Sequence, residues 1–305
     1  MPLWISFTLF AVCMQSLRTA AQKQLAGNLS VSATTLVRYL FGLPFAALYF
    51  LFIALEPGDD KGTLVLVLPS NLFSESRFIL SAALAGLAQI LATYFLIQTL
   101  LLRNFSVGTA LAKTQALQAA IIGSVFFNEP LHWLGYLSVG LGVIGVLFIS
   151  NVKVSQYTSV DRRALVFGLG SGLLFAMTSW FVRDASLALE GPRLLAAATV
   201  LLVTVSLQTL LCLAWVCAKQ RDELKRLRQN LAACWFIGIT SLAGSIGWFT
   251  ANTLQNPALV NTVGQIEFVV TLLITHFYFS EKIMPREGVG MLLIVIGIYT
   301  LLQVS

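Results

Sequence analysis

Two apolar stretches of the sequence carry charged side chains of opposite sign. Thr109–Glu129 reads TALAKTQALQAAIIGSVFFNE, is long enough to cross a bilayer, and holds Lys113 in its first half. Asn261–Glu281 reads NTVGQIEFVVTLLITHFYFSE and holds Glu267 in its first half. A cation near the middle of a membrane helix costs about 2.5–3.5 kcal/mol on insertion scales. We therefore expect the protein to provide a partner or a ligand for this charge.

The two stretches are related by an offset of 152 residues, since 281 − 129 = 152. The offset takes Thr109 to Asn261 and Lys113 to Gln265, so each predicted helix has a polar pair four residues apart on one face. A second polar position in each helix, Gln115 in the first and Glu267 in the second, lies about 200° round the helix from that face. Only one of these faces can point squarely into a central cavity.

Two interpretations of Lys113 and Glu267 remain open. In the first, both side chains contact a solute or protons at a repeat axis, with Glu267 and Gln115 in proton coupling or gating. A carboxyl group inside a membrane helix is a candidate for proton transfer. In the second, the two residues form an ion pair that locks two helices together.

Further candidates for solute binding lie in other apolar segments. Tyr94 with Gln98, and Trp248 with Asn252, place an aromatic ring one turn from an amide. Such a pair suits an amphipathic solute, although aromatic side chains also anchor helices at membrane interfaces. Two arginines in apolar segments are candidates for attracting an anionic group, but we favour their extending to the membrane surface. The two arginines are Arg18 and Arg183, and Trp180, three residues before Arg183, is a further candidate for solute binding.

The composition indicates a membrane protein. Of the 305 residues, 57% are hydrophobic and 10% are charged, against about 25% charged in a soluble domain. The net charge of +6 comes mostly from short connections, which favours membrane topology over nucleic-acid binding. The sequence contains no metal-ligand spacing, phosphate loop or nucleophile–base set. We therefore expect no cofactor, no metal site, no nucleic-acid partner and no enzymatic activity.

Ten apolar runs long enough to span a membrane predict an all-α integral membrane protein with ten transmembrane helices. The polar segment 152–161 divides the chain into halves of five helices, 1–151 and 162–305. An odd number of helices per half makes the second copy enter the membrane inverted. The predicted spans are 3–25, 33–55, 77–102, 106–127, 131–151, 164–189, 193–218, 231–254, 258–279 and 287–304.

The connections between the predicted helices indicate an orientation. Most basic residues lie on one side of the ten-helix arrangement, so the positive-inside rule places both termini outside the cytoplasm. The longest basic connection, Lys219–Asn230, reads KQRDELKRLRQN. We interpret it as a solvated loop in preference to a short interfacial helix.

Each half ends with a Phe-Asn-Glu-Pro-Leu or Phe-Ser-Glu-Lys-Ile motif, followed by a glycine-rich span, GYLSVGLGVIGVLFI or GVGMLLIVIGIYTLL. This pattern resembles the drug/metabolite transporter superfamily, specifically the EamA-type repeat occurring twice. The resemblance implies a central cavity lined by helices 1, 3, 4, 6, 8 and 9, and transport of small metabolites by alternating access. Many members have a proline where this chain has Ala116 and Phe268, so we expect straighter helices here. The resemblance also implies that both termini are cytoplasmic, which is opposite to the orientation that the basic connections indicate.

The residues and the resemblance together predict a secondary active transporter, an exporter or exchanger, for a small amphipathic metabolite such as an amino acid or organic cation. The alternative is a protein that binds or translocates a lipid or its headgroup. We expect a multi-pass protein of the bacterial inner membrane. Its expected partners are a small-molecule substrate, the lipid bilayer and protons, and its expected assembly is a monomer or weak homodimer.

Overall fold

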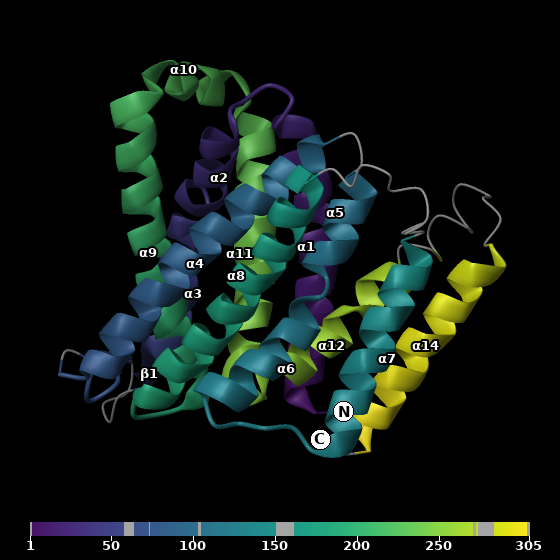
Figure 1. Ribbon diagram of the computed structural model, residues 1–305. Helices are drawn as coiled ribbons and strands as arrows, with labels where there is room; N and C mark the ends of the chain where they lie inside the picture. The colour runs from purple at the N-terminus through teal and green to yellow at the C-terminus, as the bar shows by residue number, and fades with distance from the viewer. Residues whose placement is uncertain are drawn as a thin grey trace. The chain divides into compact units, whose positions relative to one another are not determined.

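The computed structural model describes residues 2–57, 64–72, 74–102, 105–150, 162–270, 273 and 284–303. The Phe-Ser-Glu-Lys-Ile motif and the boundary between the halves at 152–161 lie outside these residues. The described chain is helical except for one short hairpin and its connections (Figure 1). The helices are α1 (Leu3–Leu25), α2 (Val31–Leu40), α3 (Leu43–Ala54), α4 (Ser76–Leu101), α5 (Phe105–Ala112), α6 (Gln115–Phe126), α7 (Trp133–Ile149), α8 (Arg162–Ala188), α9 (Arg193–Lys219), α10 (Arg221–Gln229), α11 (Leu231–Leu254), α12 (Pro257–Gly264) and α14 (Pro285–Leu302). The strands are β1 (Leu55–Pro57) and β2 (Leu64–Leu66).

The described helices are consistent with the ten predicted spans. Seven are long and apolar enough to cross a membrane when α2 and α3 are taken together as Val31–Ala54, and α7 is a shorter apolar helix. The two remaining predicted spans correspond to helices that are divided, α5 with α6, and α12 with the helical residues 266–270.

The chain forms two compact units, each of which takes segments from both halves of the sequence. Unit 1 contains Leu91–Trp180 and Gln255–Ser305, and unit 2 contains Pro2–Ile90 and Phe181–Leu254. Helices α4 and α8 therefore contribute residues to both units. Because each unit mixes the halves, equivalent helices of the two repeats can be compared inside one unit.

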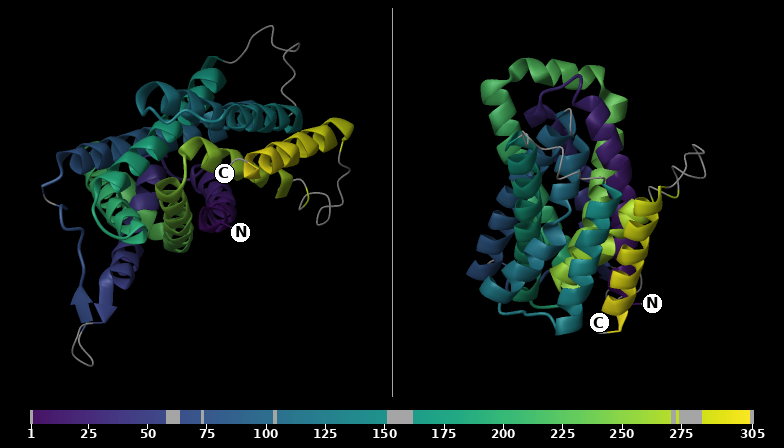
Figure 2. Two further views of the ribbon diagram at one scale, coloured as in Figure 1. Left: turned by 90° about the horizontal axis from the view of Figure 1, so that it is seen from below. Right: turned by 45° about the vertical axis from the view of Figure 1, so that its right-hand side comes forward.

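In unit 1, α7 and α14 lie side by side and antiparallel (Figures 1 and 2). A Cβ atom on Gly145 would lie 2.6 Å from the carbonyl oxygen of Gly290, and one on Gly297 would lie 2.9 Å from that of Ser138. The 152-residue offset relates Gly145 to Gly297 and Ser138 to Gly290. It therefore converts the first contact into the second, with the roles of α7 and α14 exchanged. This reciprocity is what an inverted repeat requires, and only glycine permits such a close approach of the backbones.

The Phe-Asn-Glu-Pro motif that ends the first divided helix has a structural role in unit 1. Asn128 has a φ of 52°, a left-handed conformation that asparagine tolerates better than most residues. The Glu129 amide donates to the Gly123 carbonyl at 3.0 Å. The Asn256 side chain donates to the Glu129 carboxylate at 3.4 Å and accepts from the Ala258 amide at 3.0 Å. The motif thus closes α6 and supports the N-terminal cap of α12.

Unit 2 contains two buried apolar clusters. One joins α3, α9, α11 and the unit-2 ends of α4 and α8, and the other joins α1, α2, α9, α10 and α11. Strands β1 and β2 pair antiparallel, with Leu55 opposite Leu66, and extend away from α3 (Figure 2). Helices α1 and α11 pack extensively against each other in this unit.

The basic connection 219–230 is a helix, α10, so its interpretation as a solvated loop is wrong. Leu224 and Leu227, three residues apart, share a face that packs on the apolar cluster around α2. The Glu223 carboxylate accepts from the Ser30 amide at 2.9 Å at the start of α2. Burial of this narrow apolar face and the polar link to α2 stabilise nine residues that would be marginal as an isolated helix.

Candidate functional site

Both repeats contain a divided helix, and the division falls at the same place. Helix α5 ends at Ala112 and α6 begins at Gln115, while α12 ends at Gly264 and the chain is helical again at 266–270. The offset takes Lys113, in the first interruption, to Gln265, in the second. Each interruption is a tight turn in which an amide bonds three residues back, Thr114 to Leu111 and Gln265 to Thr262, both at 3.1 Å. The expectation of straighter helices is therefore wrong.

The first interruption arises without proline. The Thr114 hydroxyl donates to the Leu111 carbonyl at 2.7 Å and competes with the helical pattern of backbone bonds. Helix α8 packs closely beside this point, because a Cβ atom on Gly172 would lie 2.8 Å from the Ala112 carbonyl oxygen. A second glycine one turn earlier, Gly168, faces the backbone of α5 in the same way.

Lys113 and Glu267 form an ion pair in unit 1. Their side chains retain 23% and 16% of their exposure, so the pair is half-buried. The Lys113 ammonium also lies 5.7 Å from the centre of the Phe268 ring. Beside the pair, the Gln115 side chain donates to the Asn261 side-chain oxygen at 3.0 Å. Lys113 and Gln115, which a continuous helix would place on different faces, therefore both bond residues of the second divided helix.

The amide of Gln265 is buried at the second interruption. Gln265 is 2% exposed, and neither its oxygen nor its nitrogen has a hydrogen-bond partner among the residues that the structure describes. The side chain occupies the space beside Gly142 of α7, where any Cβ atom would overlap its oxygen. The side-chain nitrogen of Asn261 is likewise buried and has no described partner. Unsatisfied polar atoms thus gather at the interruption.

The other predicted residues of unit 1 have different surroundings. The Gln98 amide donates to the Tyr94 hydroxyl at 3.1 Å along α4, so this pair is linked. Thr109 accepts a backbone bond from Lys113 at 3.2 Å. Trp180 is 1% exposed, donates to the Ala119 carbonyl at 2.8 Å and stacks on Phe127 at 4.9 Å between ring centres. The structure places Trp180 in the core, where it holds α8 against α6.

The predicted residues of unit 2 are mostly buried. Arg18 is 2% exposed, so it does not extend to the membrane surface as expected. Arg183 does not extend outward either, because it donates to the carbonyls of Asn252 and Thr253 at 3.3 and 3.4 Å. The Trp248 indole donates to the Gln15 side-chain oxygen at 3.0 Å and thereby links α11 to α1.

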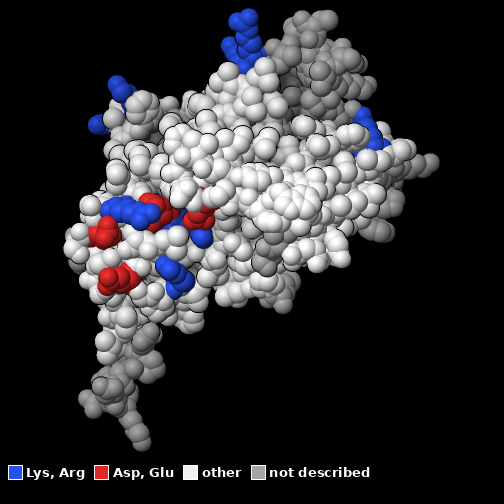
Figure 3. All heavy atoms as spheres, turned by 60° about the horizontal axis from the view of Figure 1, so that its bottom comes forward, with Lys and Arg blue, Asp and Glu red and all other residues white. Residues whose placement is uncertain are grey.

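A polar cluster at the unit-2 ends of α4 and α8 was missed from the sequence. Arg77 and Ser81 both bond the Asp184 carboxylate, Ser81 at 2.6 Å. The Asp184 side chain is 11% exposed, whereas Arg77 is 64% exposed. Figure 3 shows that acidic and basic side chains gather in one patch on this face. Asp184, the single acidic residue in the apolar stretch 162–188, is the feature of the sequence that could have indicated this cluster.

A helical membrane protein with inverted repeats, each containing a helix divided at the equivalent place, has the architecture of membrane transporters. The EamA-like transporter family matches residues 2–151 and 162–303. The chain therefore belongs to the EamA-like transporter family, and the predicted repeat fold is confirmed. It is a multi-pass membrane transporter of the drug/metabolite type, and members of this family are transporters, not enzymes.

A solved structure described only as "Crystal structure of protein" has the same fold. It matches with a TM-score of 0.67 at 13% sequence identity, over 97% of this chain and 95% of that chain. No curated protein matches the sequence. The family match establishes the class of transporter, and the similar structure supports the fold.

Proposed function

We propose that the protein is a secondary active transporter of a small zwitterionic metabolite of the amino-acid type in a bacterial inner membrane. The main observation that supports this proposal is the ion pair between Lys113 and Glu267, which lies where the two equivalent helices are interrupted. In this proposal the halves 1–151 and 162–305 move relative to each other in alternating access, as an exporter or exchanger.

The charges at the interruptions favour a zwitterion. A substrate carboxylate pairs with Lys113 and a substrate ammonium pairs with Glu267, so the substrate replaces one ion pair by two. A substrate with one charge leaves one of the half-buried side chains without its partner, which is unfavourable in a membrane interior. This replacement of one ion pair by two lets the substrate bind one conformation of the transporter more tightly than the other. Such a difference in affinity is what a substrate-driven conformational change requires.

The amides at the interruptions supply the remaining recognition. The side-chain amides of Asn261 and Gln265 have buried atoms with no hydrogen-bond partner among the residues that the structure describes. Each such atom lowers the stability of the protein by about 1–3 kcal/mol while it stays without a hydrogen bond. A conformation in which these amides bond a substrate or water removes that cost. Tyr94 and Gln98 provide a ring and an amide for the apolar and polar parts of the solute.

Counterflow in proteoliposomes tests this proposal. Vesicles are loaded with one unlabelled solute and assayed for accumulation of its labelled form. The solutes form matched sets that carry both charges, only the ammonium or only the carboxylate. The zwitterions should exchange and the singly charged analogues should not. Exchange of organic cations alone would contradict the role of Lys113, and movement of labelled lipid without solute exchange would favour lipid translocation.

Proton coupling is tested in the same vesicles. An inward pH gradient should drive accumulation if Glu267 releases and binds a proton between states. Accumulation that is independent of the gradient would leave exchange as the mechanism and remove Glu267 from coupling.

A further inference from the structure

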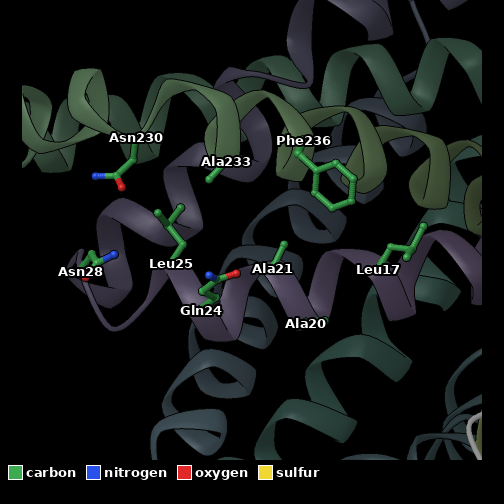
Figure 4. A pocket seen from close by; sticks show the side chains of 9 residues that line it. All are labelled: Leu17, Ala20, Ala21, Gln24, Leu25, Asn28, Asn230, Ala233 and Phe236. Atoms are coloured by element: carbon green, nitrogen blue, oxygen red, sulfur yellow. The ribbon is translucent and has the colours of Figure 1, made fainter. Parts of the chain in front are cut away.

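A cavity of about 450 Å³ lies in unit 2, in the crevice between the C-terminal half of α1 and the start of α11 (Figure 4). Three small side chains, Ala20, Ala21 and Ala233, leave the space open. This volume lies in the range of small-ligand sites, about 300–1,000 Å³. None of the residues proposed to bind the transported solute lines it.

The lining changes from polar to apolar along the crevice. Gln24, Asn28 and Asn230 lie at one end, where α1 finishes and α11 begins, and Leu17 and Phe236 lie at the other (Figure 4). Leu17 and Phe236 are 48% and 47% exposed and belong to membrane-spanning helices. The apolar end is therefore open toward the bilayer, whereas the polar end is at the level of the helix termini.

The polar end lies beside a concentration of positive charge. Helix α10, which leads directly into Asn230, contains Arg221, Lys225, Arg226 and Arg228 against Asp222 and Glu223. Glu223 is engaged with the Ser30 amide and with Arg226. Lys225 and Arg228 are exposed, and α10 joins the ends of two helices long and apolar enough to cross a membrane, α9 and α11.

We propose that this crevice binds one anionic phospholipid. The amides of Gln24, Asn28 and Asn230 bond the glycerol and phosphate oxygens, the cations of α10 attract the negative charge, and an acyl chain leaves past Leu17 and Phe236. The amphipathic lining matches a lipid better than a water-soluble solute, because the apolar end opens into hydrocarbon. This site is separate from the proposed transport site and does not depend on the identity of the solute.

Native mass spectrometry of the full-length protein, released from nanodiscs of equal phosphatidylglycerol and phosphatidylcholine, tests the proposal. Wild-type protein should retain one phosphatidylglycerol in preference to phosphatidylcholine. The double variant Lys225→Gln/Arg228→Gln should lower this preference about fivefold for each cation near the headgroup. Arg193→Gln, an exposed cation at the other end of α9, is the matched control and should leave the preference unchanged.

A second set of variants tests the cavity itself. Ala233→Phe fills the space and should abolish retention, whereas Ala232→Phe, at the adjacent exposed position of α11, should not. If Ala233→Phe fails to fold, Ala20→Phe at the rim replaces it. Equal retention of both lipids by wild-type protein, or unchanged retention in the filled variants, overturns the proposal.

Discussion

The side-chain oxygen of Gln265 occupies the space that a Cβ atom on Gly142 would need. The two residues belong to neighbouring segments of unit 1, and the amide is buried there without a described hydrogen-bond partner. The second helix interruption is thus accommodated by a glycine in the adjacent helix.

Gly142→Ala should displace this amide and destabilise the protein by about 1–3 kcal/mol, because overpacking a close contact forces a shift. Adding Gln265→Ala should recover most of the loss, as expected for residues in contact. Thermal unfolding in detergent measures both effects. Gly140→Ala is the control, because its Cβ would meet no atom within 4 Å. Equal effects of Gly142→Ala and Gly140→Ala would contradict the close contact.

Lys113→Met and Glu267→Leu should each lower stability by about 1–3 kcal/mol. This is less than the 3–5 kcal/mol for breaking a fully buried pair, because both side chains keep some exposure. The double variant should recover stability but not transport, since the charges then serve the solute. A double variant that transports normally shows that the pair is only structural.

Glu267→Gln keeps the shape of the side chain and removes the titrating group. We expect it to express and unfold like the wild type but to lose the pH dependence of exchange in proteoliposomes. Asp222→Asn, on exposed α10, is the matched control and should leave the pH profile unchanged. Wild-type transport by Glu267→Gln across the pH range would exclude this carboxylate from coupling.

Trp180→Phe should lower stability by about 1 kcal/mol, the net contribution of the bond to Ala119. Trp180→Ala should cost about 3–5 kcal/mol, as for other buried aromatic side chains. Because Trp180 is 1% exposed, the KM of Trp180→Phe should match that of the wild type. A raised KM with unchanged stability would instead place Trp180 in contact with the solute.

The orientation in the membrane is tested with single cysteines at the two ends of α9, in a background lacking Cys13, Cys212, Cys217 and Cys234. Helix α9 has 27 residues and is about 40 Å long, so its ends face opposite sides. If α10 is cytoplasmic, Arg193→Cys should react with an impermeant thiol reagent on intact cells and Lys225→Cys should react only after permeabilisation. The reverse result would place both termini in the cytoplasm.

The sequence predicts the spans well, because hydrocarbon tolerates few polar residues. The runs predicted at 3–25 and 231–254 coincide with α1 and α11. The interruptions were not predicted, since Lys113 and Gln265 sit in tight turns that need no proline. Trp180 and Arg18 were candidates for binding solute, and the structure buries both side chains. Trp180 packs against Gly123 of α6, a residue distant in the sequence, and periodicity does not reveal such a contact.

The reciprocal contacts of Gly145 with Gly290 and of Gly297 with Ser138 form the kind of seam found between two identical subunits. In a true homodimer every substitution is made twice, so a lysine near the axis would face its own copy. Covalent fusion of the halves removes that constraint. Here Lys113 corresponds to Gln265, and Gln115 corresponds to Glu267, so one cation and one anion meet without duplicates. Fusion thus permits a dipolar centre that a symmetric pair could not build.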